Sequence, residues 1–302
     1  MSRSPWRREV RARARACVYY IPQISRCCLL ECAEETIAMT TRSPPPPPPF
    51  NRKRARRQEL LCVDVSGRGG ASADQWRRAS PHRMNPAAQP LLVQDVQGDA
   101  RWISQHERFV QECKDAEPDV LFIGDSMIQL MQQHEVWKDL FSPLHALNFG
   151  LAGDTTCNVL WRIQNGELQN IQPKVVVLWV GTNNHQHTAE QVAGGVTAIT
   201  QLLISQLPRA KIIVLGLLPR GEHQNPLREK NAAVNELLRS SLARLDPAQF
   251  LDVSAEFVQS DGSILKRDMF DFLHLTAAGY QTLSKPLHDL LLQILEETTA
   301  AK

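Results

Sequence analysis

Three short segments carry the residue types that an ester-cleaving enzyme needs. Gly124-Asp125-Ser126 contains a hydroxyl nucleophile, Gly181–Asn184 contains side-chain amides, and Asp271–His274 places a carboxylate three residues before an imidazole. A serine nucleophile needs a base that accepts its proton, a carboxylate that orients the base, and donors that stabilise the oxyanion. The three segments therefore predict a serine hydrolase in which Ser126 attacks, His274 acts as the base, and Asp271 orients His274.

The oxyanion donors are predicted from the same turns. Ser126 can offer its own backbone N–H, and Asn183 can offer its side-chain amide. Gly153, in the turn that ends at Asp154, permits a close backbone approach and exposes a third N–H group. We expect Ser126, Gly153 and Asn183 to form the oxyanion hole.

Each segment also has a purely structural alternative. Asp125 or Ser126 could cap a helix, and so could Asp154 or Thr155. A loop rich in Gly and Asn tolerates left-handed turns without any function, and a single Asp-x-x-His pair is usually a surface pair. The occurrence of all the segments in one chain, in this order, favours the catalytic interpretation.

Apolar runs bounded by Pro and Gly predict the elements that hold these residues. Runs that are apolar throughout indicate parallel strands with both faces covered, and the segments between them show the three- and four-residue spacing of helices. The expected strands are 119–123, 145–149, 174–180, 211–217 and 249–253, and the expected helices are 126–140, 155–165, 188–206, 225–245 and 276–297. This alternation predicts an α/β fold, a three-layer α/β/α sandwich around a five-stranded parallel sheet of the flavodoxin-like kind. Its site should lie at the carboxyl ends of the strands.

The composition divides the chain into two parts. Residues 1–83 carry 17 Lys or Arg against seven Asp or Glu, whereas the rest of the chain carries 17 against 25. A proline run at 44–49 and a basic cluster at 52–57 interrupt any hydrophobic periodicity in the first part. We therefore expect residues 1–83 to be a disordered, basic, Pro-rich extension, either a real tail or an artefact of the gene model, and residues 84–302 to form the hydrolase domain.

Several other functions are not expected from the sequence. No apolar run is long enough for a membrane span. The basic cluster could be a nuclear signal or bind polyanions, but such runs are more often only solvated. His185 and His187 have the spacing of metal ligands, but no further ligand cluster lies near them in the sequence, and Cys157 reads as a small core residue. We expect no metal, no cofactor and no nucleic-acid partner.

The segments resemble the sequence blocks of the SGNH, or GDSL-type, hydrolases. Ser126 matches the first block, Gly153 the second, Asn183 the third, and Asp271 with His274 the fifth. The chain has Ala152 where this family usually has a second glycine, and we expect the change to be tolerated because Gly153 is kept. The resemblance implies the same fold and an esterase that requires no metal.

From about residue 84 to 295 the chain resembles one group of this family, the catalytic alpha subunits of intracellular platelet-activating factor acetylhydrolase type I. The resemblance rests on the stretches 95–102, 140–150, 179–185 and 215–221. Some stretches lean towards one alpha paralogue and some towards the other, so the paralogue stays open. The resemblance implies hydrolysis of the sn-2 acetyl ester of a phospholipid. Met127, Thr182 and Leu273 flank the catalytic positions in the sequence, and our hypothesis is that they narrow the acyl pocket.

The same resemblance implies partners and a location. It implies a cytoplasmic dimer, formed with a second copy or with the paralogous alpha subunit, that binds a lissencephaly-type WD40-repeat regulatory protein. Two alternatives remain open from the sequence. One is another SGNH activity, such as a carbohydrate esterase or a lysophospholipase, and the other is a subunit whose main role is scaffolding.

Overall fold

The structure is a computed structural model that describes residues 85–300. The expectations for residues 1–83, including the basic extension, lie outside the described residues. The described part starts with a short 3-10 turn, η2 (Pro86–Ala88), in which the Asn85 side chain accepts from the Ala87 N–H.

Five parallel strands form one sheet, as the sequence predicted. The strands are β1 (Val120–Gly124), β2 (Ala146–Gly150), β3 (Val175–Trp179), β4 (Lys211–Leu215) and β5 (Ala248–Leu251), in the order β2-β1-β3-β4-β5. All residues of β1 and β3 are buried. Their runs of Val, Leu, Ile, Phe and Trp therefore make contact with a helical layer on each face, as expected for a parallel sheet.

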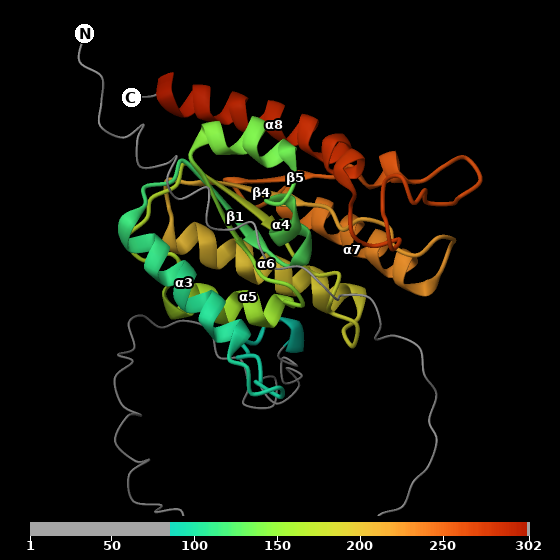
Figure 1. Cartoon of the computed structure of the whole chain (residues 1–302), viewed down its shortest axis with the longest axis horizontal. Helices are drawn as coiled ribbons and strands as arrows, with labels where there is room; N and C mark the ends of the chain where they lie inside the picture. The colour runs from blue at the N-terminus through green and yellow to red at the C-terminus, as the bar shows by residue number, and fades with distance from the viewer. Residues whose placement is uncertain (1–84, 301–302) are drawn as a thin grey trace, which may run out of the picture. The chain divides into compact units, whose positions relative to one another are not determined.

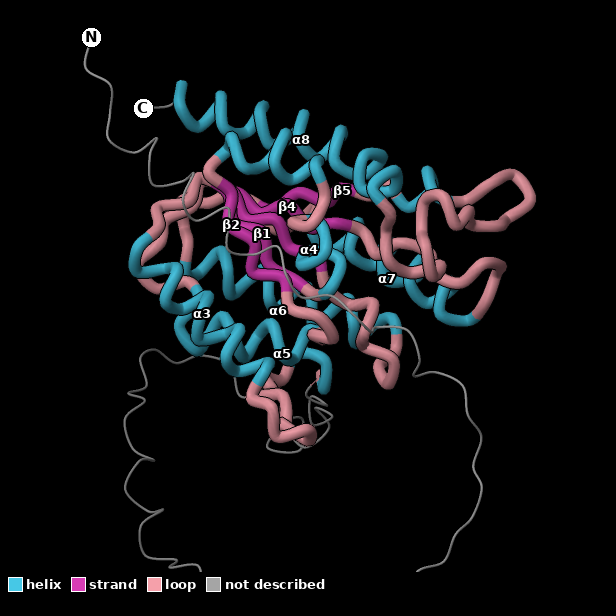
Figure 2. The backbone as a smooth tube through the Cα atoms, viewed as in Figure 1, coloured by secondary structure: helices cyan, strands magenta, loops and turns pink. Residues whose placement is uncertain are grey.

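Helices cover both faces of the sheet (Figures 1 and 2). One layer contains α4 (Ser126–Met131) and the C-terminal helix α8 (Ala277–Ala300), and the other contains α3 (Arg101–Asp115), α5 (Thr156–Arg162), α6 (Ala189–Gln206) and α7 (Pro226–Leu242). Because the chain moves one way from β1 to β2 and the other way from β3 onwards, a switch point lies between β1 and β3. Ligands of open α/β sheets bind at such points.

Two predicted helices are shorter than the sequence suggested. The helix expected at 126–140 ends at Met131, because the N–H groups of Gln133 and His134 bond to the carbonyls three residues before them and tighten the last turn. A separate π-helical turn, η3 (Trp137–Phe141), follows, and then a 3-10 turn, η4 (Ser142–Leu144). The helix expected at 155–165 ends at Arg162 and continues as the π-helical turn η5 (Ile163–Glu167).

The sequence prediction missed α3. Its buried residues are His106, Phe109 and Cys113, which follow one face at three- and four-residue spacing. The signal is therefore present, but a histidine interrupts its apolar character. Phe109 stacks on Phe149 of β2, with ring centroids 4.6 Å apart, and this contact fixes α3 against the sheet beside the predicted site.

Register places the ends of the first three strands side by side. Gly124 of β1 is the partner of Gly150 of β2 and of Trp179 of β3. A Cβ added at Gly124 would lie 2.0 Å from the Trp179 carbonyl oxygen, so only glycine allows this approach. The segments that follow these three strands, which carry Ser126, Gly153 and Asn183, consequently start from one edge of the sheet.

Candidate active site

Ser126, His274 and Asp271 form a continuous hydrogen-bonded chain. Ser126 Oγ lies 3.1 Å from His274 Nε2, and His274 Nδ1 lies 2.7 Å from Asp271 Oδ2. With the proton on Nδ1, the imidazole donates to the carboxylate and leaves Nε2 free to accept from the hydroxyl. This is the geometry that a nucleophile, a base and an orienting carboxylate require.

Local backbone bonds hold Asp271 in place. Asp271 Oδ1 accepts from the N–H of Leu273 at 3.1 Å and from the N–H of His274 at 2.7 Å. Phe272 between them has a φ of 59°, a left-handed conformation that is uncommon for a non-glycine residue and that makes this turn tight. Partial burial raises the pKa of Asp271, but the hydrogen bonds from His274 and Leu273 outweigh it and bring the pKa below the ordinary carboxyl value. Asp271 is therefore ionised at neutral pH.

Ser126 is the first residue of α4, and Asp125 is the cap. The Asp125 side chain accepts from the Met127 N–H at 2.9 Å, which settles which of the two residues caps the helix. The Met127 carbonyl accepts from the buried Tyr280 hydroxyl of α8 at 2.7 Å. Two hydrogen bonds thus hold the turn that carries Ser126, one to its own cap, Asp125, and one from Tyr280 of the C-terminal helix.

The three predicted oxyanion donors come from neighbouring loops. Gly153 has a φ of 84°, which glycine adopts without strain, and a Cβ built there would meet no atom within 4 Å. Ala152 beside it has no left-handed backbone, which agrees with the expectation that alanine is tolerated there. Asn183 donates one amide N–H to the Asp154 carbonyl at 3.0 Å. Its second amide N–H is available to a ligand.

The three residues expected to narrow the acyl pocket line one small cavity. Met127, Thr182 and Leu273 surround a space of about 10 Å³, together with Asp125, Trp179, Leu217 and Leu218. Such a space holds about one water molecule. Arg220 Nη1 donates to the Thr182 carbonyl at 3.0 Å and to its hydroxyl at 3.3 Å, which fixes one wall.

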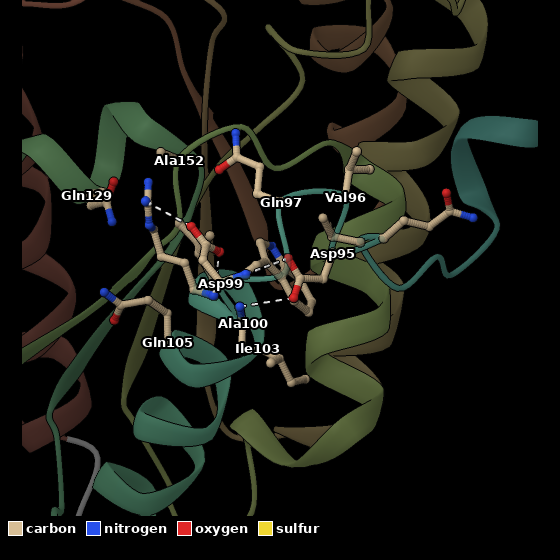
Figure 3. A pocket seen from close by; sticks show the side chains of 14 residues that line it. Asp95, Val96, Gln97, Asp99, Ala100, Ile103, Gln105, Gln129 and Ala152 are labelled. Carbon is tan, nitrogen blue, oxygen red and sulfur yellow. Dashed lines mark hydrogen bonds and ion pairs between the residues drawn. The ribbon is translucent and has the colours of Figure 1, made fainter. Parts of the chain in front are cut away.

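Much larger cavities border the loops that carry the oxyanion donors. One of about 510 Å³ is lined by Gln129 of α4, by Leu151 and Ala152, and by residues 93–105 (Figure 3). Another of about 460 Å³ is lined by Asn183, Asn184 and His185, with Pro90 and Leu91 on its apolar side. Each of these two cavities is thus more than tenfold larger than the cavity lined by Met127, Thr182 and Leu273.

The remaining sequence candidates have structural contacts. His187 Nδ1 lies 3.0 Å from the Asn184 amide, and burial lowers the pKa of His185 and of His187. Within residues 85–300, no group of three or more His, Cys, Asp or Glu side chains could hold a metal ion. Cys157 is buried and lies 3.2 Å from the Pro86 carbonyl, in agreement with the core role expected for it.

Known proteins share this arrangement of sequence and fold. Residues 122–282 match the model of the GDSL-like Lipase/Acylhydrolase family. The chain belongs to this family. The family is one of lipases and acylhydrolases, so the chain is a carboxylic ester hydrolase.

Named relatives within the GDSL-like family cover most of the chain. It is 66% identical over 218 residues to platelet-activating factor acetylhydrolase IB subunit alpha2 of Rattus norvegicus, an alignment that covers 72% of this chain and 95% of the relative. The alpha2 subunit of Homo sapiens matches to the same extent, and the alpha1 subunit of Rattus norvegicus is 61% identical over 213 residues, 70% of this chain and 92% of the relative.

Solved structures of this family agree with the fold. A GDSL-like lipase of Bacteroides thetaiotaomicron aligns with a TM-score of 0.50 at 19% identity, over 62% of this chain and 97% of its own. A Bacteroides fragilis protein aligns with a TM-score of 0.54 at 20% identity, over 67% of this chain and all of its own. At these identities the likeness bears on the fold alone.

Sequence reasoning missed the residues whose hydrogen bonds support the segments of the candidate site. Tyr280 and Arg220 bond to the segments of Ser126 and Asn183, and the fully buried Arg162 contacts the ends of two strands. A single Tyr or Arg in a helical pattern normally reads as a core aromatic or a solvated charge. No local spacing marks Arg162, because Glu167 lies five residues later, outside the three- and four-residue spacing of helical pairs.

Asp125 gives the hydrolase a measurable pH dependence of stability. Burial raises the pKa of Asp125 to about 7, from an ordinary value of 3.8. Between these two values the folded chain binds more protons than the unfolded chain, so the free energy of unfolding falls as the pH rises. We predict that Asp125→Asn, which can still cap α4, removes this component, so that the variant gains stability relative to the wild type between pH 5 and pH 8.

Urea unfolding of the wild type and of Asp125→Asn, each at about pH 5 and about pH 8, measures the difference in the free energy of unfolding. The exposed Asp139 serves as the control, since Asp139→Asn should leave the pH dependence as in the wild type. Equal pH dependence of the wild type and Asp125→Asn would contradict the assignment.

Proposed function

We propose that this chain hydrolyses the sn-2 acetyl ester of platelet-activating factor and related short-chain acetyl phospholipids. The observation that carries the proposal is the hydrogen-bonded chain from Ser126 through His274 to Asp271. The identity to subunits named as platelet-activating factor acetylhydrolases supports the choice of substrate. In this proposal Ser126, His274 and Asp271 are the catalytic residues, and Ser126, Gly153 and Asn183 form the oxyanion hole.

The first half-reaction transfers the acetyl group to the serine. Ser126 Oγ attacks the acetyl carbonyl carbon while His274 Nε2 accepts the hydroxyl proton. The negative charge that forms on the carbonyl oxygen is stabilised by the N–H groups of Ser126 and Gly153 and by the Asn183 amide. When the tetrahedral intermediate collapses, the bond to the glycerol oxygen breaks, and His274 returns its proton to that oxygen.

The second half-reaction regenerates the serine. A water molecule loses a proton to His274 and attacks the acetyl-serine, and the same three donors hold the second oxyanion. Acetate leaves and Ser126 recovers its proton. Asp271, ionised at neutral pH, stabilises the imidazolium that forms in both halves.

The cavities around the site differ greatly in size, which supports a substrate that joins a short acyl group to a large alcohol. The cavity lined by Met127, Thr182 and Leu273, at about 10 Å³, leaves room for no more than a very small group. The cavities beside Ala152 and Asn183, at about 510 and 460 Å³, are in the size range that accommodates drug-sized ligands. An acetyl ester of a lysophospholipid has this asymmetry.

The first prediction concerns Ser126. The full-length chain should release acetate from platelet-activating factor, and Ser126→Ala should lower kcat by at least about 10³-fold, because it removes the nucleophile. Ser240→Ala, which changes an exposed serine of α7, is the control and should match the wild type. Acetate release by mass spectrometry or a coupled assay measures both.

Other results would assign the site differently. Full activity in Ser126→Ala would contradict the assigned nucleophile. A folded wild type that ignores the phospholipid but cleaves acetylated sugars or long-chain lysophospholipids would replace the proposed substrate with another activity of the family.

The second prediction concerns the acyl pocket. Leu273→Ala should enlarge the cavity and raise the ratio of kcat/KM for butyryl over acetyl esters by about tenfold, since one or two methylenes in an apolar pocket change binding by this order. Leu292→Ala in α8, a partly exposed leucine away from the cavity, should leave the ratio unchanged. An unchanged ratio in Leu273→Ala would contradict the proposed pocket.

We also propose that the chain is a cytoplasmic subunit of a larger assembly. The named relatives are subunits, and the sequence resemblance implies a second alpha chain and a lissencephaly-type WD40-repeat protein as partners. Within residues 85–300, no helix is long and apolar enough to cross a membrane.

Light scattering should give the mass of a dimer for the purified chain. Addition of the WD40-repeat protein should give a larger complex that forms equally well with Ser126→Ala, because the nucleophile lies within the site. A monomer at micromolar concentration that remains unbound in the presence of the WD40-repeat protein would contradict the assembly.

A further inference from the structure

A buried ion cluster lies behind the loops that carry the proposed oxyanion donors. Arg162, at the end of α5, is fully buried, and so are its two carboxylate partners. Arg162 Nε donates to Asp154 Oδ2 at 2.7 Å, and Nη1 donates to Glu167 Oε2. Arginine is suited to such a role, because its planar guanidinium can donate in several fixed directions at once.

The same guanidinium also bonds to the sheet. Arg162 Nη2 lies 3.2 Å from the Gly124 carbonyl of β1 and 3.2 Å from the Phe149 carbonyl of β2. Gly124 is two residues before Ser126, and Phe149 is four residues before Gly153. One side chain therefore connects the strand ends that lead to two of the three proposed donors.

Asp154 extends the connection to the third donor. Its carboxylate accepts from Arg162 on one oxygen and from Trp102 Nε1 on the other, each at 2.7 Å. Its backbone carbonyl accepts from the Asn183 amide at 3.0 Å. Asp154 is also the residue directly after Gly153. The position of Asn183 and the conformation of Gly153 therefore both depend on how Asp154 is held.

The charges of Arg162 and its carboxylate partners make the bonds of this cluster costly to break. Burial lowers the pKa of Arg162, but Glu167 and Asp154 outweigh it and raise the pKa above the usual value, so the guanidinium stays charged. His106 of α3 lies with Nδ1 2.8 Å from the second oxygen of Glu167. Breaking one bond in such a cluster would leave a buried charge unpaired, which is costly.

We propose that Arg162 and Asp154 are positioning residues for the oxyanion hole. They act through Ser126, Gly153 and Asn183 and touch no substrate atom. The proposal rests on the proposed function, since it takes these three residues as the oxyanion donors. A donor displaced by about 1 Å can cost of the order of 100-fold in rate, so the cluster should matter for kcat more than for KM.

Arg162→Lys is the principal test. Lysine keeps the charge but cannot reach Asp154, Glu167 and both carbonyls together, so we expect kcat to fall by about 10- to 100-fold while KM changes by less than about threefold. The apparent pKa of the basic group in the pH profile should not move, because Arg162 makes no contact with His274 or Asp271. The rate of Ser126 phosphonylation by a fluorophosphonate should fall in parallel, since that adduct also places an oxygen in the hole.

Two further variants keep the test decisive. Leu291→Ala leaves a cavity under α8, far along the chain from the cluster, and should lower the melting temperature while kcat stays within about twofold of the wild type. Trp102→Phe removes the donor to Asp154 and keeps an aromatic ring beside His106 and Trp161, so it should fold and lower kcat by about three- to tenfold. It decides the question if Arg162→Lys does not fold.

The outcomes separate this proposal from the proposed function. Wild-type acetate release that disappears in Ser126→Ala upholds the function, and the fluorophosphonate rate tests the cluster even if acetate release fails. A folded Arg162→Lys, or Trp102→Phe, with wild-type kcat and wild-type phosphonylation would overturn the proposal. So would a loss of kcat in Leu291→Ala as large as that in Arg162→Lys, because the effect would then follow stability alone.

Discussion

Parallel pairing of β1 with β2 and with β3 is the constraint on which the site depends. Because the three strands run in one direction and Gly124 is in register with Gly150 and Trp179, the segments that follow them start from the same edge. Residues 126, 153 and 183 are far apart in sequence, yet each lies within a few residues of this edge. The last loop, before α8, then needs to supply only His274 and its carboxylate.

Buried charged side chains stabilise the loops at this edge of the sheet. Asp125 and Asp154 are both buried close behind the nucleophile, and the Asp154 charge adds to the burial that raises the pKa of Asp125. Arg162 neutralises Asp154, and Arg220 partly offsets Asp125. An unpaired carboxylate would be expensive in this environment, so the two arginines allow short polar turns at a place where the sheet itself is apolar. Loss of the Arg162–Asp154 ion pair should loosen the loops that carry Gly153 and Asn183.

Local sequence signals were enough to predict the sheet and the common edge from which the segments of Ser126, Gly153 and Asn183 start, since apolar runs that end at Gly or Pro mark strand ends and strand ends of a parallel sheet meet. The signals failed where a position depends on a distant partner. Met127 accepts from Tyr280, which is 153 residues away, and Arg162 bonds to strands that precede it. Helix α3 was missed because its buried face includes His106, which reads as a polar interruption in the sequence. In the structure His106 bonds to Glu167 of η5, a partner 61 residues away.

The most direct test of the account is a crystal structure of the protein with a methylphosphonyl group covalently attached to Ser126, because the tetrahedral phosphorus copies the proposed intermediate. The account predicts a phosphonyl oxygen at about 2.7–3.2 Å from the N–H nitrogens of Ser126 and Gly153 and from Asn183 Nδ2. The methyl group should lie in the cavity formed by Met127, Thr182 and Leu273. A phosphonyl oxygen that points away from Gly153 and Asn183, or a methyl group directed towards Ala152, would contradict the account.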